Sequence, residues 1–145
     1  MRKIRPELVL AALAMLSAPA HATDTVTVKD GWFRSLPAKL PAGGYFTLHN
    51  GGAATIKLTG AQSPACGMIM LHKTEEKNGT GMMMEVPSID VPPGGDLTFA
   101  PGNYHLMCMD PTPAMKPGAM VKVTLEFADG TQAVSDFAVK NAAGK

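Results

Sequence analysis

Hydrophobic and polar residues alternate in short runs along most of this chain, and Gly, Pro and Asn separate the runs. The clearest run covers residues 121–127, where Val, Leu or Phe stands at every odd position and Lys, Thr or Glu at every even one. A period of two is typical of a half-buried strand. Asp129-Gly130 then predicts a turn, and residues 133–139 predict the returning strand. No stretch keeps the helical period, so the sequence predicts one all-β domain, a sandwich or barrel.

The remaining runs predict further strands and the turns between them. The predicted strands are residues 26–28 and 31–34 with a bulge between them, 45–49, 54–59, 68–72, 82–86, 96–99 and 104–109. Residues 36–44 are rich in Pro and Gly and predict a loop. Residues 68–72 are almost wholly apolar, which favours a buried strand with Met68 as a core residue. Residues 73–80 are charged and contain Asn78-Gly79, the strongest short signal for a hairpin.

The first 22 residues have the pattern of a cleaved signal peptide. A basic start precedes a short apolar run at residues 8–16, and Ala20-His21-Ala22 is a cleavage site. The apolar run is too short to span a bilayer, and no Cys follows it there to carry a lipid anchor. We therefore expect an exported, soluble protein whose single domain covers residues 23–145.

Charge and composition narrow the function classes. The formal net charge is +1, and it becomes −1 when the three basic residues and the one acidic residue of the signal peptide are removed. A near-neutral surface lacks the basic stripe that nucleic acid requires, and it gives no reason to expect binding to acidic membranes. Methionine is abundant, with 11 residues in the chain, and most of these lie between Met68 and Met109.

Imidazole and thioether side chains recur in that methionine-rich stretch at short offsets. His72 is followed after ten residues by Met83, then after twenty-one more by His105, with Met107 two positions beyond. On a strand, His105 and Met107 project from the same face. Imidazole and thioether without a nearby carboxylate suit copper(I) better than zinc, iron or magnesium. The sequence therefore predicts a copper(I) site formed by His72, Met83, His105 and Met107.

These four residues and the segments around them resemble the PCuAC family of periplasmic copper(I) chaperones. The family pattern of His, ten residues, Met, twenty-one residues, His, one residue, Met falls on the four candidate ligands with both spacings intact. G-W-F-R, G-Y-F-T-L-H-N, S-P-A and P-G-N-Y-H-L-M also match, so that the resemblance covers about residues 26–139. It implies a cupredoxin-like Greek-key β-sandwich in the periplasm, a monomer that carries copper(I) toward the copper centre of cytochrome c oxidase. The acceptor would be an oxidase subunit or a Sco-type thiol protein.

Several neighbouring residues keep alternative interpretations. Met70 shares a strand face with His72, and Met109 shares one with Met107, so either could assist or replace a ligand. Met82 and Met84 face away from Met83, although a bulge could exchange them. His49 is interpreted as a structural residue. Cys66 and Cys108 form either a disulfide or free thiols. The amine of Thr23, at the start of the mature chain, could add a copper(II) site. Cys108 is expected to point away from Met107.

Three other functions compete with copper delivery. A blue copper electron-transfer site needs two His, a Cys and a weak axial Met, yet no His follows Cys108 in this chain. An enzyme would need a nucleophile with a base, or paired carboxylates in a cleft. Glu75-Glu76 lie in a charged turn and the pair His105 and Cys108 is crowded by methionines, so catalysis is not expected. A periplasmic copper buffer with the same site stays an alternative to delivery.

Overall fold

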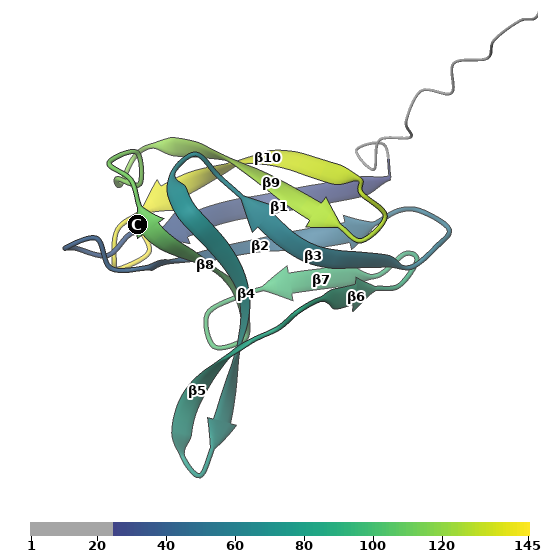
Figure 1. Cartoon of the computed structure of the whole chain (residues 1–145), viewed down its shortest axis with the longest axis horizontal. Helices are drawn as coiled ribbons and strands as arrows, with labels where there is room; N and C mark the ends of the chain where they lie inside the picture. The colour runs from purple at the N-terminus through teal and green to yellow at the C-terminus, as the bar shows by residue number, and fades with distance from the viewer. Residues whose placement is uncertain (1–24) are drawn as a thin grey trace, which may run out of the picture.

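The computed structural model describes residues 25–145, which form strands and turns without a helix (Figure 1). The predicted signal peptide and Thr23 lie outside the described residues. The strands, in chain order, are β1 (Val26–Arg34), β2 (Ala42–Asn50), β3 (Ile56–Gln62), β4 (Cys66–Lys77), β5 (Thr80–Glu85), β6 (Ile89–Val91), β7 (Asp96–Phe99), β8 (Tyr104–Pro111), β9 (Met120–Phe127) and β10 (Gln132–Lys140). The predicted all-β class is confirmed. No helix in this part of the chain is long and apolar enough to cross a membrane.

The strands close into a barrel-like sandwich. Hydrogen-bonded neighbours run in the order β4, β8, β2, β1, β10, β9 and β3, and a contact between Ala61 of β3 and Ile69 of β4 closes the circuit. The pair β1 and β10 is parallel, and the other pairs are antiparallel. Strands β5, β6 and β7 lie outside this circuit, paired with β4, β3 and β2. Closure leaves few free strand edges, which protects the fold from edge-to-edge association.

One apolar core fills the interior, and it explains the alternation in the sequence. The alternating residues of β9, Val121, Val123, Leu125 and Phe127, are all buried. The ring centroids of Phe33 in β1 and Phe137 in β10 are 5.5 Å apart. Those of Phe46 in β2 and Phe99 in β7 are 4.4 Å apart. Burial of such aromatic and branched side chains is the main stabilising contribution to a domain of this size.

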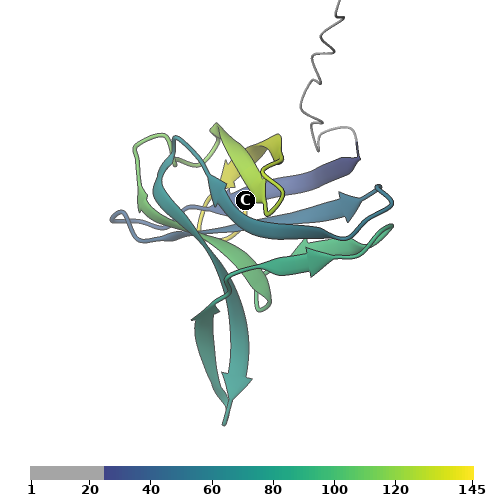
Figure 2. The same cartoon turned by 45° about the vertical axis from the view of Figure 1, so that its right-hand side comes forward.

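The hairpin of β4 and β5 extends from the barrel as an arm. Figures 1 and 2 show β4 leaving the barrel wall and β5 returning along it, well clear of the other strands. The charged segment predicted as a hairpin forms this arm, and its turn is at Asn78-Gly79, both with positive φ (54° and 76°). Positive φ at both central residues is the requirement of a type I′ turn. All six residues of β5 are exposed.

Some predicted boundaries are wrong, for identifiable reasons. Residues 68–72, predicted as a buried strand, belong to the longer strand β4, which has only one buried face. The other face of β4 is not buried because β4 forms part of the barrel wall, so that only its inner face contacts the core. Met68 is 58% exposed and is not a core residue. The predicted strand 54–59 begins later and continues through Gly60, where a register shift against β9 accommodates the glycine. The short strand β6 was not predicted.

The predicted loop 36–44 is also wrong at its end, because β2 begins at Ala42 and includes Gly43 and Gly44. Glycine inside a strand often marks a place where other groups approach closely. A Cβ atom at Gly44 would lie 2.6 Å from the Phe33 ring and 3.0 Å from Cβ of Leu106. Gly43 and Gly44 therefore belong to the closely packed part of the barrel wall where β2 pairs with β8.

We expect Gly44→Ala to lower the free energy of unfolding by about 1–3 kcal/mol, since overpacking of a filled core costs that much. The matched control is Gly81→Ala in the arm, where no atom lies within 4 Å of the new Cβ. Urea denaturation of both variants measures the difference. Equal effects of the two substitutions would contradict the close packing at Gly44.

Candidate metal centre

Strands β4 and β8 bring three of the four predicted ligands together. In their antiparallel register His72 is paired with His105, and Met70 is paired with Met107. Cross-strand partners project from the same face, with Cβ atoms roughly 4.5–5.5 Å apart. This is the outer face of the barrel wall, because Leu71 and Leu106 of the same strands are buried in the core. His72, His105 and Met107 are thus neighbours on one outer face.

The arm brings the fourth predicted ligand to the same face. The turn at Asn78-Gly79 sets a register in which Thr74 of β4 is paired with Met83 of β5. Thr74 lies two residues beyond His72 on one strand, so Met83 shares the face of His72. Met82 and Met84 project from the other face, as the sequence predicts for a regular strand.

A hollow of about 510 Å³ lies where these side chains meet, and its wall includes Met83, His105 and Met107. Thr74, Tyr45 and Arg34 are also in its lining. His105 is 4% exposed, whereas Met83 is 62% exposed. The hollow is therefore closed on the barrel side and open on the side of the arm. His72 does not line it, but its ring meets that of His105 edge-on, with centroids 5.5 Å apart.

The two imidazoles each present a buried nitrogen that has no hydrogen-bond partner among the described residues. For His105 this atom is Nε2, and for His72 it is Nδ1. Nδ1 of His105 lies 3.1 Å from the carbonyl oxygen of Asn103. A carbonyl only accepts, so Nδ1 carries a proton, and in the neutral form of the ring Nε2 has the free lone pair. Metal-binding histidines are oriented in this way by a partner on their other nitrogen.

Burial lowers the pKa of His72 below its ordinary value of 6.5, and the neighbouring His105 lowers it further, while Glu85 raises it. A lowered pKa keeps the imidazole neutral at pH 7, as a metal ligand must be. The unfolded chain binds more protons than the folded one between the two pKa values. Folding stability from this residue is therefore fully present above pH 6.5 and is lost as the pH falls through the pKa of the folded state.

We expect Glu85→Gln to lower the pKa of His72 further, because Glu85 is paired with His72 in the β4–β5 register and its carboxylate favours the charged ring. The measurement is the imidazole titration of the metal-free protein followed by NMR. Glu75→Gln, farther along the same arm, is the control and should leave the midpoint in place. A rise of the midpoint in Glu85→Gln would contradict this electrostatic account.

The donor set decides which ions fit. The described residues contain no group of three or more His, Cys, Asp or Glu side chains arranged to hold a metal, so a site here depends on thioethers. Imidazole with thioether is a soft, uncharged set that suits copper(I). The Arg34 guanidinium lies 5.4 Å from the Trp32 ring centroid and 5.7 Å from that of Tyr45, in the wall of the hollow. Its fixed charge favours a monovalent ion over a divalent one.

The two cysteines are joined, which settles the alternative that the sequence leaves open. Cys66 and Cys108 form a disulfide, with their Cα atoms 5.4 Å apart. Cys108 is fully buried and points away from Met107, as expected. Neither sulfur is a thiolate, so the Cys ligand of a blue copper site is missing from this arrangement.

Three residues near the site, Glu85, Arg34 and Asn103, were not predicted from the sequence. Glu85 places a carboxylate opposite His72, contrary to the expectation that no carboxylate is nearby. The Asn78-Gly79 turn contained the signal, because a two-residue turn fixes which residues pair along both strands. Arg34 and Asn103 had no such signal, since only the closed barrel brings them to the site. His49 is a surface residue whose Nδ1 lies 2.6 Å from a carboxylate oxygen of Asp96.

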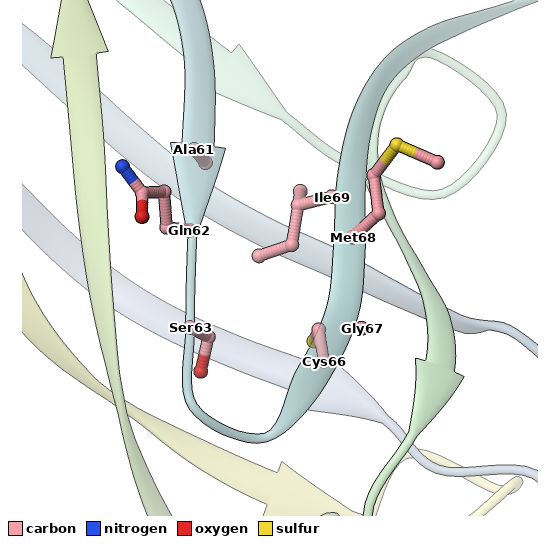
Figure 3. A pocket seen from close by; sticks show the side chains of 7 residues that line it. All are labelled: Ala61, Gln62, Ser63, Cys66, Gly67, Met68 and Ile69. Carbon is pink, nitrogen blue, oxygen red and sulfur yellow. The ribbon is translucent and has the colours of Figure 1, made fainter.

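A second hollow, of about 350 Å³, lies where β3 and β4 separate beyond their contact (Figure 3). Gln62, Ser63 and Cys66 line it together with apolar residues and Met68, and none of its lining side chains is a free imidazole, carboxylate or thiol. Met68 is the one lining residue that carries a thioether, and a single thioether does not make a metal site.

The profile of the family described as "Putative lipoprotein LpqE-like" matches residues 26–139, nearly the whole described domain. The chain belongs to the LpqE-like family. This LpqE-like protein is 32% identical over 132 residues to "Putative lipoprotein Lxx21020" of Leifsonia xyli subsp. xyli, covering 90% of this chain and 79% of that one. It is 31% identical over 98 residues to "Uncharacterized protein RP573" of Rickettsia prowazekii, covering 67% of this chain and 54% of that one.

Solved structures similar to the LpqE-like chain include PCuAC domains. The copper-bound PCuAC domain from PmoF2 has a TM-score of 0.68 and 22% identity, covering 83% of this chain and 97% of that one. The copper(I) form of DR1885 from Deinococcus radiodurans has a TM-score of 0.65 and 30% identity, covering 88% of this chain and 85% of that one. The predicted cupredoxin-like Greek-key fold is confirmed.

Proposed function

We propose that this protein is an exported copper(I) chaperone of the PCuAC type, with His72, Met83, His105 and Met107 as its copper ligands. One observation carries the proposal. Among the described residues, two buried imidazole nitrogens without a hydrogen-bond partner belong to the same face as the thioethers of Met83 and Met107. Leaving such a nitrogen buried and unpaired costs roughly 1–3 kcal/mol, and a bound soft ion would offset this cost. The copper(I) form of DR1885, which is 30% identical to this chain, supports copper(I) as the bound ion.

The arrangement is suited to release as well as to binding. The ligands are uncharged, so they hold copper(I) less tightly than thiolates would. His105 is fixed by Asn103 and by burial. Met83 belongs to the exposed strand β5 at the open side of the hollow. An acceptor approaching from this side would displace Met83 first, and the ion would pass by stepwise exchange of ligands.

The place of action and the acceptor belong to the same proposal. The pattern of residues 1–22 and the relatives named as lipoproteins support export, and we propose that this protein acts in the periplasm as a soluble monomer. The proposed acceptor is the copper centre of cytochrome c oxidase, reached through an oxidase subunit or a Sco-type thiol protein. As a carrier, the protein performs no catalysis.

Metal transfer separates delivery from buffering. The copper(I)-loaded protein is mixed without oxygen with the metal-free copper domain of the oxidase or with a Sco-type protein, and the copper on each is measured after separation. Delivery predicts that most of the copper moves within minutes, and that a strain lacking the gene loses oxidase activity at low copper and regains it at high copper. A buffer would keep its copper, and the deletion would raise copper sensitivity and leave oxidase activity unchanged.

A further inference from the structure

A row of methionines continues beyond the proposed ligands along the outer face of the barrel wall. The β4–β8 register pairs Met68 with Met109, directly next to the pair of Met70 and Met107. Ile69, between Met68 and Met70, is buried, and Cys108, between Met107 and Met109, is buried as well. The four thioethers therefore share the face that carries His72 and His105.

Their spacing allows several sulfurs to reach one ion. Paired residues on one face have Cβ atoms roughly 4.5–5.5 Å apart, and diagonal neighbours are about 7–8 Å apart. A methionine side chain has three rotatable bonds and can turn its sulfur toward a point between such neighbours. Met68, Met70, Met107 and Met109 occupy the four positions of two adjacent cross-strand pairs on this face.

Core packing does not account for these residues. Met68 is 58% exposed, and Met70 and Met109 are half-buried at the surface. Figure 3 shows the side chain of Met68 on the opposite side of the β4 ribbon from Ile69, which points toward β3. No ionisable side chain interrupts the row between the two methionine pairs. A soft, uncharged surface of this kind selects copper(I) over harder cations.

We propose that Met68, Met70 and Met109 form a second copper(I) site, weaker than the first and composed only of thioethers. It extends the proposed function, and its ligands are separate from the two histidines. Met107 stands between the two sites, paired with Met70 and two residues from His105. An ion on the methionine row can therefore reach the imidazole site by exchanging one thioether at a time, without passing through water uncoordinated. The row is an entry path for copper.

The test uses protein carrying ¹³C-labelled methionine methyl groups, titrated without oxygen with copper(I) and followed by NMR. The Met83 and Met107 methyls should shift during the first equivalent, and those of Met68, Met70 and Met109 during the second. The double variant Met68→Leu with Met109→Leu should lose the second equivalent and keep the first, because leucine preserves the volume and removes the sulfur. Met120→Leu is the control, since Met120 is 63% exposed on β9, away from this face.

The outcomes separate this inference from the proposed function. If the Met68, Met70 and Met109 methyls stay in place while those of Met83 and Met107 shift, the second site is wrong and the first stands. If they shift only when the Met120 methyl also shifts, binding is unspecific and the second site is again wrong. If they shift first while Met83 and Met107 do not respond, the methionine site stands and the proposed ligand set of the carrier is wrong.

Discussion

Replacing His105 by alanine is expected to weaken copper(I) binding by at least about 100-fold. The reason is that changes in groups that merely orient a ligand already cost 10–100-fold in affinity, and His105 would itself be a ligand. Its Nε2 is buried and unpaired, and its Nδ1 is held by Asn103, so its geometry is prepared before the ion arrives. A competition titration with a copper(I) chelator in the absence of oxygen measures the change.

His49→Ala is the matched control for this experiment. His49 lies on β2 at the surface, next to Asp96, and has no place in the hollow. Its replacement should leave the copper(I) affinity within about twofold of the original. If His105→Ala also binds copper(I) as tightly as the unmodified protein, His105 is not a ligand. If both variants weaken binding equally, the effect is a general one on the fold.

Removal of the disulfide has the second large expected effect, on stability. Cys66 and Cys108 are 42 residues apart, and closing a loop of that length stabilises a fold by about 4 kcal/mol in the chain-entropy description. We expect the double variant Cys66→Ala with Cys108→Ala to lose about this much free energy of unfolding. Chemical denaturation of the two proteins, compared under non-reducing conditions, measures it.

The same double variant also separates stability from binding. Cys108 points into the core while Met107 points outward, so copper(I) affinity should stay within about threefold at temperatures where the variant is folded. A loss of less than about 1 kcal/mol would contradict a structural role for the bond. A large loss of copper affinity in a folded variant would show that the bond positions β8 for the site.

The sequence was most informative where a single period or turn determines the structure. Alternation along β9 and β10 predicted both strands within one residue at each end. Asn78-Gly79 predicted the hairpin, whose register places Met83 on the face of His72. The spacing of His105 and Met107 predicted that both share one face. These features depend on residues close together in the sequence, which is why they could be predicted.

Features that depend on long-range packing could not be predicted. Apolar composition suggested that residues 68–72 are buried, but composition does not say which of the two faces of a strand the barrel covers. Gly43 and Gly44 look like loop residues until Phe33 and Leu106 are seen next to them. The approach of Arg34 to the hollow likewise depends on the pairing of β1, β2 and β8.

X-ray absorption at the copper edge, on protein loaded with one equivalent of copper(I), reports the atoms that bind the ion. We expect a copper(I) edge and a first shell of two nitrogen and two sulfur scatterers. In the variant carrying His72→Ala and His105→Ala, the nitrogen contribution of the two imidazoles should be lost, because only the thioethers remain to hold the ion. A shell of nitrogen and oxygen alone in the unmodified protein, or an imidazole signal that persists unchanged in this variant, would contradict the site of His72, Met83, His105 and Met107.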